Sequence, residues 1–535
     1  MVDSLESIKQ TLPCLLTHNP LSTNLFTTNI DIHKDSVGLA MTQTEELQKE
    51  ILEVYKVNEP FGTAAITKDP ETHELQYAVF EPTLTEEEKK NFQQIRDFLI
   101  ERLDVAMSEL EGEKKAEEYL EKQVIKIVKD FNIQVNEFSL EKILYYIIRD
   151  YVGYSKIDVI MRDPLIEDIS CNGANTPVYI WHREYESVQS NVIFSSEAEL
   201  NSFVVRLAYR TGRMISMANP ILDASLPDGS RIQMTFGKVV TKGGSTFSIR
   251  KFKSDPYTIV DLIKLGTLSS SIAALSWYLI ENKYNIFVCG PTASGKTTTL
   301  NCLANFIHPN YKVVTIEDTP EIKLHQENWF RSVTRPSVGT ASEISLFDLL
   351  KAAMRQRPDY IIVGEIRGSE AYTLFQAIAT GHGGISTLHA DSVASVVHRL
   401  ETEPMNIPRS LVIGLNVIMI QQRLQIGDKP ARRLITTTEL VGLDTRTNEI
   451  ITNELFKYKP DEDNYQYSDR SYHLEKIAKW LGKSMKEITD EIEKRKVILD
   501  WMAKNNIRSF KQVSDVIRSF YANPEEALNL AKVGA

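Results

Sequence analysis

From about residue 265 onward, short runs of apolar residues alternate with segments in which apolar residues recur every three or four positions. Short apolar runs favour strands that are buried on both faces, and the wider spacing favours amphipathic helices. The predicted strands are Ile286–Cys289, Val313–Ile316, Tyr360–Val363 and Ile385–Leu388, and the predicted helices between them are Thr297–Ile307, Ile344–Arg357 and Glu370–Thr380. Strands that alternate with helices predict an α/β fold with a parallel sheet covered on both faces.

The pattern differs on either side of this region. Residues 151–249 mix short β-like runs with one helical segment, Ser195–Arg213, whose opening serines are typical caps, and together they predict an α+β domain. Ser, Asp and Pro break both periodicities at Phe252–Thr258, which we therefore expect to be a linker. The segment Tyr472–Leu530 is helical in pattern.

The first hundred or so residues carry weaker signals. Residues 1–40 are rich in Ser, Thr and Asn and predict a poorly ordered lead-in, after which Thr44–Val54 predicts a helix. Turn residues separate a predicted strand pair, Gly62–Ile66 and Glu74–Phe80. The charged segment Thr83–Glu121 predicts helix with a solvated face rather than a binding patch.

Composition and charge limit the classes of protein that fit. The chain has 535 residues, of which 42% are hydrophobic and 25% charged, so it can bury large cores. Lys and Arg number 61 against 72 Asp and Glu, which gives a net charge of −11. This balance argues against a protein whose main surface binds nucleic-acid phosphates, although it leaves room for a small basic channel.

The four cysteines, at 14, 171, 289 and 302, include no C-x2-C pair, which argues against a zinc module or a disulfide framework. They fit a reducing cytosol. We expect no secretory signal, because the first twenty residues lack a basic start before a long apolar run. Leu411–Ile420, among the longest apolar stretches, is too short to span a bilayer.

The strongest motif is GPTASGKT at residues 290–297, which matches G-x-x-x-x-G-K-[ST] between a predicted strand and a predicted helix. Glycines let the backbone wrap a phosphate, and the helix N-terminus adds its positive dipole end. We predict that Lys296 reaches the β- and γ-phosphates of ATP and that the Thr297 hydroxyl ligates Mg²⁺. The predicted phosphate-binding residues are Gly290, Pro291, Thr292, Ala293, Ser294, Gly295, Lys296, Thr297 and Thr298.

Three further predicted strands end in groups suited to phosphate chemistry. Glu317 and Asp318 follow one strand, Glu365 follows the second and His389 the third. Parallel sheets bind ligands at the carboxyl ends of their strands, so these side chains should lie beside the phosphate loop. Each alone would be an ordinary surface carboxylate or a satisfied histidine, but together they predict nucleotide hydrolysis rather than storage.

These residues lie within segments that resemble a known family. KVVTIEDTPEI resembles the aspartate box, RQRPDYIIVGEIRGSEA the Walker B segment and TGHGGISTLHADS the histidine box of the ATPases that drive type II secretion, type IV pili and type IV secretion. The resemblance runs from about Tyr145 to Leu440. It implies a RecA-like P-loop motor domain, preceded by a PAS-like α+β domain that faces the nucleotide and by an accessory, partly helical N-terminal region. It implies four parts: an accessory N-terminal region at 1–110, the α+β domain at 111–255, the motor domain at 256–470 and a helical C-terminal extension at 471–535.

The resemblance also implies roles for individual residues. Glu317 would be the water-activating carboxylate, Glu365 the Walker B acid, holding Mg²⁺ directly or through water, and His389 the γ-phosphate sensor. Upstream, GRMISMANPILDASLPDGSRIQ and STFSIRKF resemble the segments that carry the family's nucleotide-facing arginines. The residues that match those arginines best are Arg231 and Arg250. Arg210 and Arg213 match less well, and an ordinary salt bridge is the other interpretation of each arginine. Asp318 and His382 lie in the motifs without a clear role, and His382 could simply shape its turn.

The subgroup resembled most is the archaeal branch, which assembles archaella and archaeal pili. The chain lacks the four-cysteine zinc insertion of many bacterial members, and LETEPMNIPRS at 400–410 is similar to the archaeal sequences. The resemblance implies a cytoplasmic homohexamer, peripheral at the inner face of the membrane, that engages a polytopic membrane platform protein and, indirectly, pilin-like subunits. It implies no direct nucleic-acid partner.

Two other functions stay open at this point. A hexameric nucleic-acid translocase of the conjugation or type IV secretion type shares the motor core, although no basic–aromatic strip of the kind that stacks single strands is visible. A nucleotide-gated scaffold with little turnover is the third. The sequence does not distinguish archaellum from pilus, name the cargo or give the direction of movement.

Overall fold

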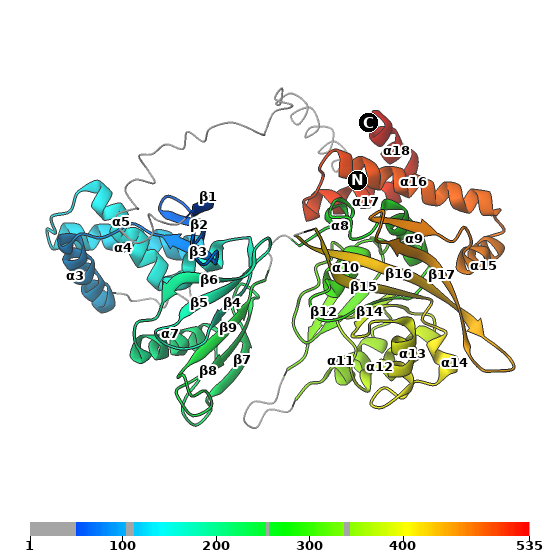
Figure 1. The fold of residues 1–535 in the computed structure, drawn as a ribbon, viewed down its shortest axis with the longest axis horizontal. Coiled ribbons are helices and arrows are strands. Elements are labelled where there is room, and N and C mark those ends of the chain that lie inside the picture. The colour runs from blue at the N-terminus through cyan, green and yellow to red at the C-terminus, as the bar shows by residue number, and fades with distance from the viewer. Residues whose placement is uncertain (1–49, 103–111, 253–255, 336–342, 428, 534–535) are drawn as a thin grey trace. The chain divides into compact units, whose positions relative to one another are not determined.

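The computed structural model describes residues 50–102, 112–252, 256–335, 343–427 and 429–533. They divide into two compact units, one ending at residue 252 and the other starting at residue 256 (Figure 1). Each unit contains its own nine-stranded sheet and its own hydrophobic cores.

The sheet of the N-terminal unit has the order β1-β2-β3-β6-β5-β4-β9-β8-β7. All neighbouring strands are antiparallel except β3 and β6, which are parallel. The strands are β1 (Glu50–Asn58), β2 (Gly62–Lys68), β3 (Leu75–Phe80), β4 (Ile166–Cys171), β5 (Pro177–His182), β6 (Glu186–Ile193), β7 (Ile221–Ser225), β8 (Arg231–Thr235) and β9 (Thr246–Arg250).

Two groups of helices complete this unit. The helices are α3 (Glu86–Arg102), α4 (Glu113–Asp130), α5 (Glu137–Tyr151), the short η3 (Ser155–Ile157), α6 (Asp158–Arg162) and α7 (Glu197–Arg210). Helix α7, which Ser196 caps, packs Phe203 and Val204 against the sheet. Helices α3, α4 and α5 form a separate small core around Leu99 and Leu120, and most of their charged residues lie on the outer faces, apart from the buried ion pair of Glu88 and Lys142.

The structure corrects one N-terminal prediction and confirms others. The predicted helix Thr44–Val54 is wrong over residues 50–54, which belong to strand β1, and its remainder lies outside the described residues, as does the lead-in. The polar and apolar residues of EILEVYKVN suit a strand, and the segment pairs with β2. The predicted strand pair is present as β2 and β3, and the predicted helix Ser195–Arg213 is present as α7.

The sheet of the C-terminal unit has the order β12-β11-β13-β14-β10-β15-β16-β17-β18. The six strands from β12 to β15 are parallel, and the last three continue the sheet antiparallel. The strands are β10 (Ile286–Cys289), β11 (Val313–Glu317), β12 (Trp329–Val333), β13 (Tyr360–Val363), β14 (Gly383–Leu388), β15 (Val417–Ile426), β16 (Lys429–Leu443), β17 (Ile450–Lys459) and β18 (Asn464–Tyr467).

Helices cover both faces of this sheet. They are α8 (Ile259–Lys264), α9 (Ser270–Glu281), α10 (Lys296–Ala304), α11 (Leu346–Met354), α12 (Glu370–Ala379), α13 (Val393–Glu401), α14 (Arg409–Val412), α15 (Tyr472–Leu481), α16 (Met485–Lys504), α17 (Phe510–Ala522) and α18 (Pro524–Val533). Alternate residues of β10 face opposite cores: Ile286 and Val288 pack with α8–α10 and α15–α18, whereas Phe287 and Cys289 pack with α11–α14. This arrangement is why the strand is apolar throughout.

The α/β fold class with a RecA-like P-loop domain is confirmed, because every strand and helix predicted between 286 and 388 is present and the strands are parallel. The division into four parts and the PAS-like character stay predictions. Contacts cross the limits set at residues 110 and 470: α3 packs with α4 and α5, and α16 packs against α9. Within the described residues, no helix is both long and apolar enough to span a bilayer.

Candidate functional site

The loop between β10 and α10 takes a backbone course that its small residues permit. Gly295 caps α10 in the left-handed conformation, with φ of 91°. At Gly290, an added Cβ would lie 2.1 Å from the backbone oxygen of Gln421 on β15, closer than atoms can approach. The loop therefore lies in close contact with β15, and only glycine fits at position 290, directly after the end of β10.

Lys296 opens helix α10 and is almost fully buried. Its Nζ donates a hydrogen bond of 2.8 Å to the carbonyl oxygen of Pro291, across its own loop. Burial lowers the pKa of Lys296, and the Glu365 carboxylate opposes that shift. The ammonium group is thus held over the loop, with a backbone carbonyl as its hydrogen-bond partner.

The sheet order brings three of the predicted residues together. Strand β14 lies between β10 and β13, so the ends of these strands are adjacent. Nζ of Lys296 lies 3.5 Å from Nδ1 of His389, and Nε2 of His389 lies 3.1 Å from Oε1 of Glu365. We call this series of contacts the Lys296–His389–Glu365 chain.

The imidazole in this chain favours the neutral form. Burial, together with the positive charge of Lys296, lowers the pKa of His389. A neutral ring that carries its proton on Nε2 donates to Glu365 and accepts from Lys296 at Nδ1, which satisfies both neighbours at once.

Glu317, the last residue of β11, has a different environment. It is 2% exposed, and its Oε1 accepts hydrogen bonds of 2.8 Å from the backbone N–H groups of Glu321 and Ile322. Its Oε2 is buried and has no hydrogen-bond partner among the described residues. Burial raises the pKa of Glu317 to about 7, although the two backbone bonds act in the opposite direction. A buried carboxylate with one oxygen unused is suited to hold a water or accept a proton.

Asp318 forms an ion pair with Arg367. The guanidinium of Arg367 also lies 3.9 Å from the carboxylate of Glu365. Arg367 belongs to the segment that resembles Walker B but was not among the predicted site residues. Nδ1 of His382 lies 3.0 Å from the carbonyl oxygen of Ala377 at the end of α12, where it stabilises the turn.

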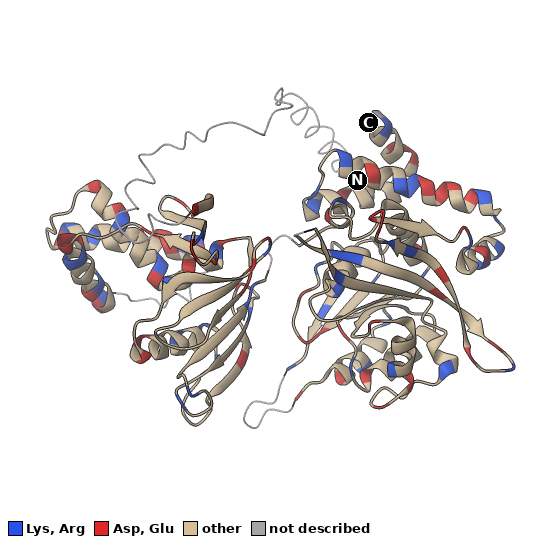
Figure 2. Cartoon of the chain, in the orientation of Figure 1, with Lys and Arg blue, Asp and Glu red and all other residues tan. Residues whose placement is uncertain are grey.

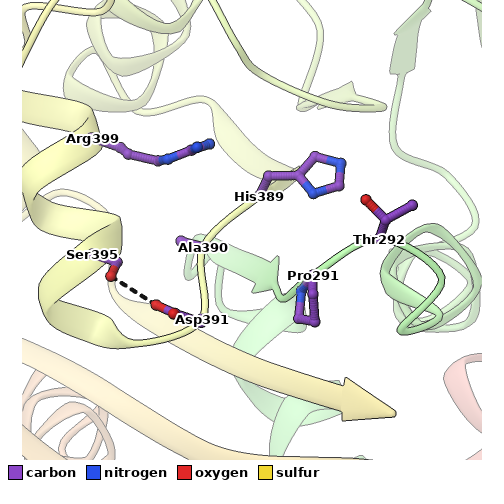
Figure 3. A pocket seen from close by; sticks show the side chains of 7 residues that line it. All are labelled: Pro291, Thr292, His389, Ala390, Asp391, Ser395 and Arg399. Carbon is purple, nitrogen blue, oxygen red and sulfur yellow. Dashed lines mark hydrogen bonds between the residues drawn. The ribbon is translucent and has the colours of Figure 1, made fainter.

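A hollow of about 380 Å³ opens beside the phosphate loop (Figure 3). Its lining residues are Pro291, Thr292, His389, Ala390, Asp391, Ser395 and Arg399. Asp391 accepts a hydrogen bond of 2.7 Å from Ser395, whereas the guanidinium of Arg399 forms no ion pair within the described part of the chain. Arg399 was not among the predicted site residues. The available signal was its place on the helix that directly follows His389.

The four predicted arginines lie in the N-terminal unit. Arg231 on β8 and Arg250 on β9 are register partners and both are exposed, so they share one face of the sheet. Arg250 pairs with Asp168 at 3.1 Å. Arg210 and Arg213 donate to backbone carbonyls instead, those of Val152 and Asp223 respectively.

The oxygen donors of the C-terminal unit suit Mg²⁺. Thr297 lies in the first turn of α10, and Glu365 follows β13. No group of three or more His, Cys, Asp or Glu side chains placed to hold a metal occurs in the described ranges. A threonine hydroxyl and a carboxylate are oxygen ligands of the kind that Mg²⁺ takes together with phosphate and water.

Comparison with known proteins places this site in a family. The model of "Type II/IV secretion system protein" matches residues 154–454, more than half of the chain. An uncharacterized protein of the archaeon Methanocaldococcus jannaschii is 37% identical over 503 residues, 89% of this chain and 90% of that protein. The probable conjugal transfer protein TrbB of Sinorhizobium fredii is 33% identical over 233 residues, 42% of this chain and 69% of that protein.

Among solved structures, the VirB11 ATPase from the Brucella suis type IV secretion system is 24% identical, with 51% of this chain and 89% of that chain covered and a TM-score of 0.27. The strand order described above identifies the fold. The Methanocaldococcus jannaschii protein is archaeal, in agreement with the resemblance to the archaeal branch. The family match and the complete phosphate loop together support nucleotide binding and ATPase activity. The chain is thus a member of the type II/IV secretion system protein family.

Proposed function

We propose that the chain is an ATP-hydrolysing motor that powers assembly of a type IV pilus-like filament, an archaellum or an archaeal pilus, or secretion through a membrane platform. The observation that carries the proposal is the Lys296–His389–Glu365 chain, in which a buried ammonium, a neutral imidazole and a carboxylate meet at the phosphate loop. A site that only stored nucleotide would need the loop but not the adjoining titratable groups.

The proposed chemistry assigns a task to each group. Lys296 binds the β- and γ-phosphate oxygens, and His389 exchanges its contact with Lys296 for one with the γ-phosphate. Glu317 orients the attacking water and accepts its proton through the oxygen that has no protein partner. Thr297 and Glu365 would hold Mg²⁺, which neutralises charge on the phosphates when bound.

Arg231 and Arg250 complete the proposal. Two exposed guanidinium groups on one sheet face can place positive charge on the developing phosphoryl group, within a chain or from a neighbouring subunit of a homohexamer. We propose that the ring works at the cytoplasmic face of the cell membrane against a polytopic platform protein, and that it moves pilin-like subunits through that partner.

The decisive experiment measures ATPase rate against protein concentration for the wild type and Lys296→Ala, with Mg²⁺ present. A specific rate that rises with concentration, and that vanishes in Lys296→Ala, supports active sites completed between subunits. A flat specific rate contradicts the ring. Equal rates for the two proteins contradict the assignment of the phosphate loop.

A nucleic-acid translocase is the second candidate, and the conjugal transfer relative favours it. The net charge of −11 counts against it, because phosphate binding requires basic surface. Adding single-stranded DNA or RNA to the same assay separates the two functions. The motor proposed here predicts an unchanged rate, whereas a translocase predicts stimulation that high salt removes.

A further inference from the structure

The turn between α15 and α16 exposes a tryptophan together with two other large apolar side chains. Trp480 is 79% exposed, and Leu481 and Met485 are each 41% exposed. All five tryptophans of the chain lie in described segments, and only Trp480 is exposed. We call this surface, with the lysines described next, the Trp480 patch.

Four lysines precede and follow these apolar side chains along α15, the turn and the start of α16, and one of them, Lys476, donates to the carbonyl oxygen of Val441. Lys476, Lys479, Lys483 and Lys486 are all exposed. Two nearby carboxylates are engaged locally: Glu475 pairs with Arg470 at 2.8 Å, and Glu487 accepts from the backbone and hydroxyl of Ser484. Asp490 lies on α16 just beyond the turn. Figure 2 shows blue residues on α15 and on the adjoining end of α16.

The exposure of Trp480 does not result from a loosely packed segment. Helix α15 ends in a left-handed cap at Gly482, and α16 begins with a capping box at Ser484. Ile477 and Ile488 anchor the two helices in the core of the C-terminal unit. The turn is therefore fixed at both ends, and its apolar residues are held outward.

This combination fits a particular kind of partner. Aromatic and aliphatic side chains ringed by lysines are typical of surfaces that enter the headgroup region of a bilayer, where the rings bury apolar area and the ammonium groups meet lipid phosphates. The chain as a whole carries a charge of −11 and would be repelled by an anionic surface. A local basic patch overcomes this repulsion, because charges beyond roughly 10 Å are screened at physiological salt.

We propose that the Trp480 patch binds the surface of an anionic phospholipid membrane. Lys479, Lys483 and Lys486 contact the lipid phosphates, and Trp480, Leu481 and Met485 insert between the headgroups. The patch would set the orientation of the C-terminal unit at the bilayer. This inference stands apart from the proposed motor activity, because binding requires neither nucleotide nor hydrolysis.

The test is co-sedimentation of the full chain, without nucleotide, with vesicles of phosphatidylcholine alone or with 30% phosphatidylglycerol (about one lipid in three, a strongly anionic surface). The wild type should bind the anionic vesicles at least about tenfold more tightly than the neutral ones, and added salt should weaken that binding. Lys296→Ala should bind vesicles as the wild type does, which separates this inference from the proposed motor function.

Two patch variants and two matched controls sharpen the test. Trp480→Ala, and the triple change of Lys479, Lys483 and Lys486 to Glu, should each reduce binding to anionic vesicles about tenfold or more. The controls are Met214→Ala, an exposed apolar side chain of the N-terminal unit, and the triple change of Lys90, Lys114 and Lys122 to Glu. Neither control should alter binding. Circular dichroism and ATPase rate check that all variants fold.

Tryptophan fluorescence gives an independent reading of the same event. Since Trp480 is the one exposed tryptophan, anionic vesicles should shift the emission of the wild type to shorter wavelength and protect it from acrylamide, and Trp480→Phe should abolish both changes. Absence of binding, or binding that both patch variants leave intact, overturns the proposal. A change in oligomeric state in the patch variants with vesicle binding unchanged would show that another protein copy covers the patch, and it would overturn the proposal equally.

Discussion

Nζ of Lys296 lies 3.5 Å from Nδ1 of His389, and the opposite nitrogen of the same ring lies 3.1 Å from Glu365. The histidine therefore connects the phosphate-loop lysine to a carboxylate at the end of a strand two positions away in the sheet. A bound γ-phosphate would compete with the ring for Lys296. The state of His389 would then differ between a chain that holds the γ-phosphate and one that does not.

The first prediction concerns His389. His389→Ala removes the contact with Lys296 and leaves Glu365 without its imidazole partner. Nucleotide affinity should change less than about tenfold, because Lys296 and the loop remain, whereas kcat should fall by roughly 10²–10⁴. Equilibrium binding of a fluorescent nucleotide and steady-state hydrolysis measure the two effects. Equal loss of binding and turnover would assign His389 to ground-state binding alone.

Arg399 supplies the second prediction. Its guanidinium lines the same hollow as His389 and Thr292 and has no ion-pair partner in the described chain, so it is available to a phosphate (Figure 3). Arg399→Ala should weaken nucleotide binding about 10- to 100-fold, the worth of one charge-assisted hydrogen bond.

Arg399→Lys is the matched control, because it keeps the charge and loses the planar fork; it should recover part of the affinity. His398→Ala, on the same helix and outside the hollow, should leave affinity unchanged. If Arg399→Ala binds nucleotide as tightly as the wild type, the hollow is not where the phosphates lie.

A third prediction separates catalysis from an ordinary ion pair at Arg250. Arg250→Ala should lower kcat by at least about tenfold, since a guanidinium that acts on the transition state is worth more than that. Stability should change by less than about 1 kcal/mol, because the pair with Asp168 is exposed.

Asp168→Ala breaks the same ion pair from its other end and should leave turnover intact. Matching losses in the two variants would mean that the ion pair, and not the guanidinium, supports activity. Thermal unfolding and ATPase rate at one protein concentration give both quantities.

The parts of the fold that the sequence predicted are those with a simple physical signature. Ile286–Cys289 and Tyr360–Val363 are apolar at every position because both faces of the parallel sheet are covered, and each was predicted to the residue. Strand β16 gave no such signal because several of its buried positions carry polar residues, among them Thr437, Thr438 and Glu439, and β17 gave none because it mixes buried and exposed positions. Residues 50–54 suit either periodicity, and pairing with β2 decided the outcome.

The candidate site likewise has a part that the sequence predicted and a part that it did not. Motif spacing located Lys296, Glu317, Glu365 and His389, because each lies at a strand end or in the loop. The contacts among Lys296, His389 and Glu365 depend on the strand order, which places β14 between β10 and β13 and cannot be obtained from spacing. Arg399 was not predicted, because an arginine on an amphipathic helix most often faces solvent and only its place on the helix after His389 pointed to the site.

The last prediction concerns Glu317, whose pKa burial raises to about 7. A water-activating carboxylate must be ionised, so the ATPase rate should rise with pH and level off above about 7. Glu317→Gln should bind nucleotide as the wild type does and lose about 10²–10⁴ of kcat at every pH, because an amide cannot accept the proton. A pH–rate profile of both proteins, with nucleotide saturating, provides the measurement.

Stability gives the same group a second, independent test. The folded chain holds the Glu317 proton up to pH of about 7, whereas an unfolded glutamate releases it near the usual 4.5, so the unfolding free energy falls as pH rises between these values. The loss is complete above pH of about 7 and amounts to at most about 3 kcal/mol.

Glu317→Gln resembles the protonated state and should unfold like the wild type at pH of about 5 but at a higher temperature at pH of about 8. Glu327→Gln, which changes an exposed carboxylate farther along the same segment, is the control and should show no such difference. A wild type whose stability relative to Glu317→Gln does not change across this range would mean that the carboxylate is hydrated and ionised, and the free oxygen would then already hold water rather than wait for a substrate.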